Sequence, residues 1–172
     1  PEYIAAQERV RTTRDATAGE EAIKSAAVRT IYLPAFNPED PERYSLYIQR
    51  AYYVNYCQRM LSNFNGAAFR NPPKIELPAA IEYMREDADG AGSSIEQMMS
   101  KAFNDVAQTG NYGILAEYSR VPAGASEDSR ADLGIRASLA AYSFESIINW
   151  DESKVGGNTV RTLTVLHETA RI

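Results

Sequence analysis

Apolar residues along the first 110 positions recur at the three- and four-residue spacing of helices. The clearest stretch covers residues 93–110, whose apolar positions are Ile95, Met98, Met99, Ala102, Phe103 and Val106. Two overlapping capping boxes in Ser93-Ser94-Ile95-Glu96-Gln97 suit the start of a helix, and Gly110 suits its end. The pattern therefore predicts an amphipathic helix that buries one face.

The longest helix is predicted over residues 41–63. Asp40 suits its N-cap and Pro41 its first position, and Asn65-Gly66 is expected to end it. One stripe at helical spacing consists of Tyr44, Tyr47, Ile48, Ala51, Tyr52 and Tyr56, and it is widened by Tyr53, Cys57, Met60, Leu61 and Phe64. Because so wide an apolar surface exceeds what one side of a core can cover, we expect this helix to make contacts on more than one side.

The rest of the helical half contains weaker sequence signals for helix starts and loops. Thr17 and Glu20 have the spacing of a capping box, which predicts that a helix starts there. Three prolines predict a loop over residues 33–40. Pro78 predicts the start of a short helix, and residues 87–92, rich in Gly and Asp, are predicted to form a hinge.

The apolar spacing changes from helical to alternating after Gly110, which predicts a strand over residues 112–118. A loop rich in Ser, Ala, Gly and charge follows at 121–132, and a second strand is predicted over 139–150. A third strand, 159–167, follows a Gly-Gly-Asn turn and forms a hairpin with the second. Helices followed by a small antiparallel sheet indicate an α+β fold, and 172 residues suit a single domain over 1–172.

Strict alternation along the last strand leaves both of its faces partly apolar. One face would carry Thr159, Arg161, Leu163 and Val165, and the other Val160, Thr162, Thr164 and Leu166. At the edge of a sheet such a strand would expose unpaired backbone groups beside apolar side chains. We expect it to be covered by chain that follows residue 172 or by a neighbouring subunit. The start at Pro1 without methionine and the end directly after a strand likewise favour a piece of a longer polypeptide.

Charge and residue counts exclude several classes of protein. The chain has 18 Lys and Arg against 23 Asp and Glu, which gives a net charge of −5. This charge disfavours a domain that binds nucleic acid by net attraction, and it also disfavours a polybasic membrane anchor. The single cysteine, Cys57, excludes an internal disulfide and a thiolate zinc cluster, and the single histidine, His167, excludes any site with two imidazoles. No apolar run is long enough to span a membrane.

The sequence offers no set of residues for catalysis. Residues 90–93 lack the preceding strand and the following lysine of a phosphate-binding loop. The acidic pairs near Glu20 and Asp87 lie in polar surroundings, where nothing raises a carboxyl pKa for general acid work. His167 and Glu168 would point to opposite faces of a strand, and Cys57 is predicted to lie in the core. We therefore predict no enzymatic activity, no catalytic residues, no cofactor and no metal site.

Eleven tyrosines are the most telling feature of the composition. Tyrosine combines a large apolar area with a polar tip and is enriched in protein interfaces. The predicted subunit-interface residues are those of the long helix, namely Tyr44, Tyr47, Tyr52, Tyr53 and Tyr56. The alternative is a core rich in tyrosine.

Four blocks of residues follow one another in an order that is similar to one known family. They are Arg14-Asp15, Gly19-Glu20, Ile23-Lys24 and Tyr32-Leu33-Pro34; then Tyr47, Arg50-Ala51, Asn55 and Gly66-Ala67-Ala68-Phe69-Arg70 before Pro72-Pro73; then Gly110-Asn111-Tyr112-Gly113-Ile114-Leu115; and finally Ile147-Ile148-Asn149-Trp150. They span roughly residues 13–150. Their order and spacing resemble the portal proteins of tailed phages, a family formerly described as a domain of unknown function.

The resemblance implies a structural subunit of a homo-oligomeric ring, typically a dodecamer, at one vertex of the viral capsid. Such a ring is the channel for genome packaging and ejection, and it contacts the terminase, the capsid and the head–tail adaptor. DNA would pass without sequence-specific binding, and no membrane is involved. The protein would reside in the virion after assembly in the host cytoplasm, and residues 1–172 would be the N-terminal, wing-type part of a longer portal chain.

One departure from the family is the segment 123–132, which is longer and more polar than the family's short strand entry. The pairing of the strands is therefore left open. An alternative function is a self-contained α+β adaptor or partner-binding domain, with the tyrosine-rich helix as its docking face. An enzyme would require residues beyond 172 to complete a site.

Overall fold

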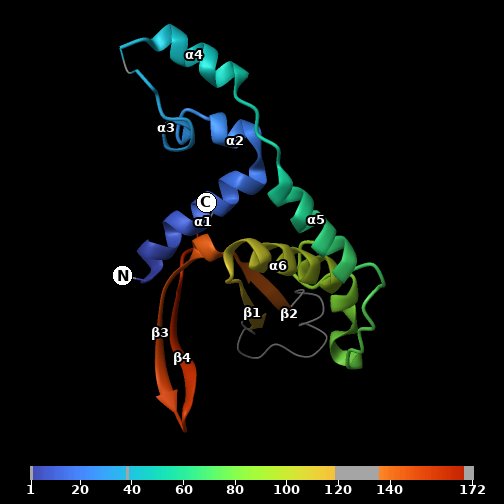
Figure 1. Cartoon of the computed structure of the whole chain (residues 1–172). Coiled ribbons are helices and arrows are strands. Elements are labelled where there is room, and N and C mark those ends of the chain that lie inside the picture. The colour runs from blue at the N-terminus through green and yellow to red at the C-terminus, as the bar shows by residue number, and fades with distance from the viewer. Residues whose placement is uncertain (1, 38, 119–135, 169–172) are drawn as a thin grey trace. The chain divides into compact units, whose positions relative to one another are not determined.

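The computed structural model describes residues 2–37, 39–118 and 136–168 of the chain (Figure 1). By their internal contacts they divide into two compact units, residues 1–68 and 69–172, and each is described by itself. Helices precede the strands in chain order, so the α+β prediction with N-terminal helices is confirmed. The single domain remains a prediction.

The first unit consists of helices joined by short connections. They are α1 (Glu2–Ala18), α2 (Glu20–Lys24), α3 (Arg29–Tyr32), α4 (Pro41–Arg50) and α5 (Tyr56–Ala68). Its buried apolar residues are Ala6, Val10, Ile23 and Leu61, from α1, α2 and α5. This small core positions the segments that carry the predicted interface residues.

The capping box predicted at Thr17 does not form. The chain is already helical there, and the Thr17 hydroxyl donates to the backbone oxygens of Thr13 (2.9 Å) and Arg14 (3.0 Å), one turn back in α1. Gly19 separates α1 from α2 with a φ of 99°, in the left-handed region that favours glycine. The helix break is therefore made by backbone geometry at Gly19.

The helix predicted over 41–63 is two helices, so that prediction is wrong. Asp40 caps α4 as expected, accepting from the Arg43 backbone N–H (3.0 Å), but Ala51 turns to extended geometry and residues 51–55 form no helix. Asn55 then caps the next helix, because its side-chain oxygen accepts from the backbone N–H of Gln58 (2.8 Å). The second helix also continues past the predicted stop at Asn65-Gly66 to Ala68.

The second unit contains two 3-10 helices, one long α-helix and two separate antiparallel strand pairs. Its elements are η1 (Ala79–Arg85), α6 (Ile95–Thr109), β1 (Gly113–Tyr118), β2 (Ala137–Tyr142), η2 (Phe144–Ser146), β3 (Ile147–Val155) and β4 (Asn158–Leu166). β1 pairs with β2 and β3 with β4, both antiparallel, so the described strands form two two-stranded sheets where one sheet was predicted. The Gly156-Gly157 turn between β3 and β4 is confirmed.

The single strand predicted over 139–150 is wrong, because the chain changes sheets in its middle. β2 ends at Tyr142, η2 intervenes, and β3 begins at Ile147. Phe144 and Ile147 are almost fully buried at this corner, and a Cβ on Gly113 would come within 3.3–3.4 Å of the Tyr142 and Ile147 side chains. Apolar burial at the corner therefore accounts for the turn that divides the strand.

The predicted α6 boundaries are confirmed by their capping interactions. Ser94 accepts from the Gln97 backbone N–H (3.1 Å), and the Gln97 side chain accepts from the Ser94 backbone N–H (3.1 Å), a complete capping box. Gly110 ends the helix in the left-handed conformation with a φ of 77°. Met98 of this helix packs with Met84 and Ala88 in the core of the second unit.

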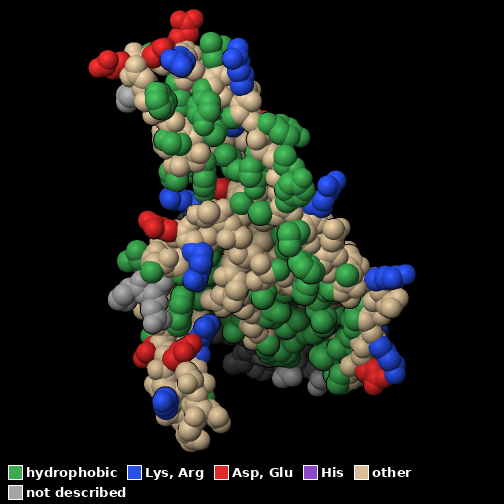
Figure 2. Space-filling model, viewed as in Figure 1, with side chains coloured by type: hydrophobic (Ala, Val, Ile, Leu, Met, Phe, Trp, Pro, Cys, Tyr) green, Lys and Arg blue, Asp and Glu red, His purple; other side chains and the backbone are tan. Residues whose placement is uncertain are grey.

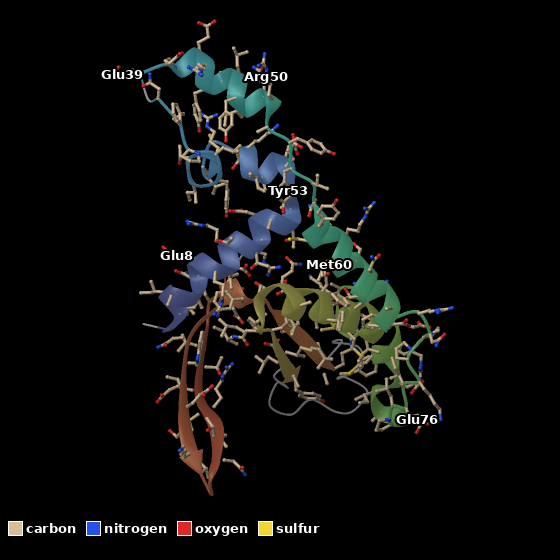
Figure 3. All side chains as sticks on the ribbon, in the orientation of Figure 1. Glu8, Glu39, Arg50, Tyr53, Met60 and Glu76 are labelled. Atoms are coloured by element: carbon tan, nitrogen blue, oxygen red, sulfur yellow. The ribbon has the colours of Figure 1, made fainter. Side chains whose placement is uncertain are left out.

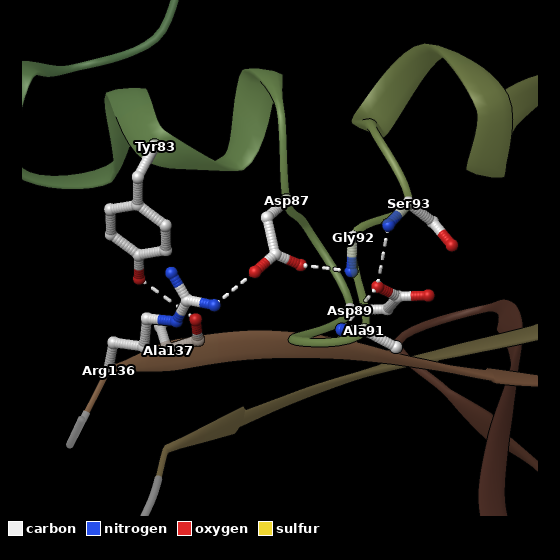
Figure 4. Close-up of polar contacts among 8 residues, drawn as sticks. All are labelled: Tyr83, Asp87, Asp89, Ala91, Gly92, Ser93, Arg136 and Ala137. Carbon is white, nitrogen blue, oxygen red and sulfur yellow. Dashed lines mark hydrogen bonds and ion pairs between the residues drawn. The ribbon is translucent and has the colours of Figure 1, made fainter. Parts of the chain in front are cut away.

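Residues 87–92, predicted as a hinge, are held in place by hydrogen bonds and by the burial of Ala88. Figure 4 shows Asp87 between the backbone N–H of Gly92 (2.9 Å) and the guanidinium of Arg136. Ala88 is fully buried, and its backbone pairs with Ser93 and Leu139. The segment is thus a packed connection in this structure. The loop predicted over 121–132 lies outside the described residues.

Candidate subunit interface

The five predicted interface tyrosines divide into two groups by exposure. The side chains of Tyr52, Tyr56 and Tyr47 are 80%, 62% and 46% exposed. Tyr44 and Tyr53 are half-buried. The division occurs within α4, which carries both Tyr44 and Tyr47, and again in the connection 51–55, which carries both Tyr52 and Tyr53.

Tyr44 and Tyr53 use their hydroxyls inside the first unit. The Tyr44 hydroxyl donates to the Leu33 backbone oxygen (2.8 Å), and the Tyr53 hydroxyl donates to that of Ala16 (3.0 Å). Figure 3 shows Tyr53 in the connection between α4 and α5. Burial raises the pKa of the Tyr53 phenol. These two rings hold their segments to the unit, as in the core alternative.

The remaining tyrosines belong to a larger exposed apolar set, which we call the α4–α5 surface. Its members are Leu46, Tyr47, Tyr52, Val54, Tyr56, Met60 and Phe64, each between 45% and 80% exposed. Figure 2 shows hydrophobic side chains gathered along the part of the first unit that Figure 1 labels α4 and α5. Soluble monomers rarely expose so many large apolar side chains in one stretch, so the feature is typical of an interaction surface.

Two cavities lie beside this surface in the first unit. One, of about 190 Å³, is lined by Phe36, Asn37, Asp40, Arg43, Tyr44 and Tyr47. The other, of about 260 Å³, is lined by Glu20, Ile23, Lys24, Tyr32, Leu33, Ala51, Tyr52 and Tyr53. The larger is lined mainly by aromatic and aliphatic side chains, the smaller by three aromatic and three polar or charged ones, and each includes tyrosines from the predicted interface set.

The charged groups of the larger cavity are paired with each other. Lys24 donates to the Glu20 carboxylate (2.5 Å), and the backbone N–H of Tyr53 donates to its other oxygen (3.3 Å). The bond from Lys24 and then the bond from Tyr53 lower the pKa of Glu20. The ionised Glu20 carboxylate accepts two hydrogen bonds and has no proton to give, so it cannot act as a general acid. The cavity is therefore better suited to binding an apolar side chain than to proton transfer.

Two hydrogen bonds between distant parts of the first unit were missed by sequence reasoning. The Tyr32 hydroxyl donates to the Asp15 carboxylate (2.9 Å), and the Asn55 amide donates to the backbone oxygen of Thr17 (2.8 Å). Burial and the Asp15 bond raise the pKa of Tyr32. Asp15, Tyr32 and Asn55 lie in separate stretches of the sequence. Their spacing in the sequence gave no signal that they meet.

Cys57 is exposed, so its predicted place in the core is wrong. The reason is that α5 begins at Tyr56, which places Cys57 in the first turn of a new helix. His167 follows the end of β4 and is exposed, with its backbone N–H bonded to the Ser146 oxygen (2.8 Å). Glu168 instead accepts from the Tyr142 hydroxyl and raises the pKa of Tyr142 to about 12.

The acidic residues near Asp87 are also structural acceptors. Backbone N–H groups of Ala91 (2.8 Å) and Ser93 (3.0 Å) donate to Asp89. The Ser93 side chain and these amides lower the pKa of Asp89 to about 2, and the bond from Gly92 lowers that of Asp87. Arg136 also lies over the Tyr83 ring, 5.2 Å from its centroid (Figure 4). These carboxylates stay ionised and hold the loop.

Within the described ranges, no three or more His, Cys, Asp or Glu side chains come together in a way that could hold a metal ion. None of the helices described has the length and apolarity needed to cross a membrane. A scan against models of known protein families finds no match to the chain, and a search of curated proteins finds none either.

Proposed function

We propose that this chain is a structural subunit of a portal ring of a tailed phage, and that the α4–α5 surface contributes to the contact between subunits. The observation that carries the proposal is the exposure of seven large apolar side chains between residues 46 and 64. The order of the four residue blocks supports the choice of family, and the exposed surface gives a physical reason for assembly.

The apolar burial available at this surface is comparable with the cost of association. Complete burial of one large apolar side chain is worth roughly 1.5–3 kcal/mol, and these side chains are about half-exposed, so the surface can contribute about 5–10 kcal/mol. Association costs an estimated ~4–15 kcal/mol. One such contact is therefore marginal, whereas ring closure gives every subunit two contacts.

The net charge of −5 suits a channel through which DNA slides. Without a net basic surface, the counterion release that drives tight, non-specific DNA binding is small. In this proposal DNA passes without sequence-specific contacts, while the terminase, the capsid and a head–tail adaptor bind the ring. The protein then resides at the capsid vertex of the virion, after assembly in the host cytoplasm, with no cofactor and no catalytic step of its own.

The test is the mass of the intact protein in solution, measured by native mass spectrometry or mass photometry. A closed ring of many copies is expected. Tyr52→Ser with Tyr56→Ser should raise the concentration at which half the subunits assemble by tenfold or more, because two exposed rings are lost from each contact. The matched control is Gln49→Ser with Gln58→Ser, which changes exposed polar residues of α4 and α5 on either side of the two tyrosines and should assemble as the parent does.

A monomer or dimer at every concentration would overturn the ring and favour the adaptor or partner-binding domain. If the Tyr52 and Tyr56 variant assembles normally and keeps its helical content, the α4–α5 surface is not part of the contact between subunits. Tyr53 is left out of the variant because its hydroxyl bonds within the unit.

A further inference from the structure

Of the large apolar side chains that the structure describes, Phe36 is the most exposed, at 98%. It lies in the connection between α3 and α4 of the first unit. A single exposed apolar residue is common on protein surfaces and by itself indicates no function. Phe36 differs from such residues because its loop is held by hydrogen bonds, a cavity of matching size lies in the same unit, and the charges beside the ring and beside the cavity are opposite.

Hydrogen bonds on both sides of Phe36 hold its loop. Before it, the Leu33 backbone oxygen accepts from the Tyr44 hydroxyl (2.8 Å). After it, the Asn37 side-chain oxygen accepts from the Glu39 backbone N–H (3.1 Å). A side chain on a loop that is already ordered loses less conformational entropy when it binds, so the ring is presented as a preorganised contact.

The larger cavity of the first unit can hold a phenyl ring. Its volume is about 260 Å³, and it is lined mainly by aromatic and aliphatic side chains. An apolar cavity of about 150 Å³ holds benzene, so the space is sufficient. The charged groups in its lining, Glu20 and Lys24, are bonded to each other and leave no net charge against an apolar guest. Phe36 does not line this cavity in its own copy.

The charges beside the ring and beside the cavity are of opposite sign. Residues 36–43 carry three acidic side chains against one basic, namely Glu39, Asp40 and Glu42 against Arg43. The segments around the cavity, 20–33 and 50–53, carry three basic side chains against two acidic, namely Lys24, Arg29 and Arg50 against Glu20 and Glu21. Figure 3 shows Glu39 and Arg50 at opposite ends of α4. Unlike charges at two ends of one unit favour a head-to-tail approach of identical units.

A second copy of this chain is the occupant that these features select. A protruding apolar side chain and a fitting pocket elsewhere on the same molecule make a heterologous contact between copies, and such contacts form a ring when the rotation closes. The acidic residues beside Phe36 disfavour nucleic acid and an anionic membrane. An unrelated protein would have to offer an aromatic ring beside acidic residues, which the loop of a second copy already does.

The ring and the cavity are both continuous with the α4–α5 surface. Tyr47 of that surface lines the smaller cavity together with Phe36, and Tyr52 lines the larger cavity. One phenyl ring buries only about 200 Å², whereas a stable interface takes about 800 Å² from each partner. We therefore expect the ring to anchor a contact whose remaining area comes from Tyr47, Tyr52 and their neighbours in the same unit.

We infer that Phe36 of one copy inserts into the larger cavity of the next copy, so that the subunits join head to tail. The inference rests on the proposed ring, and it names the anchor and the direction of the contact between subunits. The apolar ring supplies affinity, and the acidic and basic ends of the unit orient the two copies.

The experiment places a photo-crosslinking amino acid, p-benzoyl-phenylalanine, at position 36 of the intact protein. Illumination is expected to give covalent bonds to residues 20–33 or 51–53 of a second copy, and mixed isotopically light and heavy protein identifies bonds between copies. Ala51→Trp places a large side chain in the lining of the cavity and should lower the crosslink yield at least fivefold. The matched control is Ala5→Trp, at an exposed position of α1 outside both cavities, which should leave the yield unchanged.

A second measurement needs no change in the cavity. Phe36→Ala should raise the concentration at which half the subunits assemble by tenfold or more, because the anchor is lost. Phe36→Tyr keeps an aromatic ring and should assemble as the parent does. Because the side chain is 98% exposed, neither variant should change the midpoint of urea unfolding.

Assembly mass is read on the same samples, which separates the two proposals. A ring whose position-36 crosslinks lie within one copy or away from the cavity, or a ring that Phe36→Ala leaves unchanged, would overturn the insertion and leave the ring. A crosslink from position 36 to the cavity of a second copy, in a protein that forms only dimers, would support the insertion and overturn the ring. A monomer at every concentration would overturn both.

Discussion

At the scale of single residues, the first unit depends on a close contact between Gly19 and Asn55. Gly19 has a φ of 99°, and a Cβ there would lie 2.9 Å from the Asn55 side-chain nitrogen, which itself donates to Thr17. The position therefore combines a backbone conformation that favours glycine with a space that admits no side chain.

Gly19→Ala is expected to destabilise the protein by about 1–3 kcal/mol, because alanine is strained at positive φ and its methyl group displaces Asn55. The measurement is the midpoint of urea unfolding. The matched control is Gly66→Ala, within α5, where an added Cβ meets nothing within 4 Å and a gain of about 0.5–1 kcal/mol is expected. Equal midpoints for the parent and Gly19→Ala would show that the α1–α2 junction is not constrained in this way.

The Asp89 carboxylate is expected to make the stability of the second unit depend on pH. Its pKa of about 2 in the folded protein lies below the ordinary value of about 3.9. A lowered pKa contributes stability that is present above about pH 4 and lost as the pH falls towards 2. Unfolding midpoints measured between pH 5 and 2 should therefore fall with acid. In Asp89→Asn this fall should be shallower, and a variant that keeps the full acid sensitivity would assign it to other groups.

At the scale of elements, local capping decides where α6 begins. Ser94→Ala removes the side chain that accepts from Gln97 and is expected to cost about 1 kcal/mol, with faster hydrogen exchange in the first turn. Ser94→Thr retains a hydroxyl acceptor and should restore most of the stability. If alanine and threonine behave alike, tertiary packing around Met98 holds the helix start instead.

The α4–α5 break shows the opposite case, in which distant groups override a helical pattern. The backbone N–H of Tyr53 bonds to Glu20, and the Tyr53 hydroxyl bonds to Ala16, 33 and 37 positions away in sequence. Tyr53→Phe removes only the hydroxyl bond and should cost roughly 1 kcal/mol in urea unfolding. Tyr52→Phe, at an 80% exposed ring, is the control and should have no measurable effect on stability. Equal effects of the two variants would contradict an internal role for Tyr53.

At the scale of the whole molecule, apolar contacts favour assembly, and repulsion between copies of the same net charge opposes it. Every copy carries −5, and the range of that repulsion falls from about 30 Å at 0.01 M salt to about 8 Å at 0.15 M. Apolar contacts are not weakened over this range. The concentration for half-assembly should therefore fall several-fold on raising NaCl from about 0.02 to 0.2 M. Weaker assembly at the higher salt would indicate that ion pairs between subunits dominate the contact.

Features that depend on a few neighbouring residues were predictable from the sequence. The Ser94 cap, the Gly110 stop, the Gly156-Gly157 turn and the order of helices before strands all follow from local hydrogen bonds and backbone preferences. Of the predicted interface tyrosines, Tyr47, Tyr52 and Tyr56 are exposed, as an interface requires before assembly. Local spacing placed Tyr47 and Tyr56 on helices correctly, but it put Tyr52 on a helix although this residue lies in the connection 51–55, and it gave no information on which tyrosines form bonds within the unit.

Only the tertiary structure decided the break at 51–55, the exposure of Cys57, the change of sheet at 143–146 and the register of the β3–β4 hairpin, in which Asp151 pairs with Leu163, Glu152 pairs with Arg161 and Thr162 is an extra residue. Periodicity describes a uniform element, and it assumes that the phase established at one end persists to the other. One extra residue at Thr162 reverses that phase, and bonds to Ala16 and Glu20 interrupt the helix without any change in the local pattern. Such effects come from groups far apart in the chain, and they appear only once those groups are brought together.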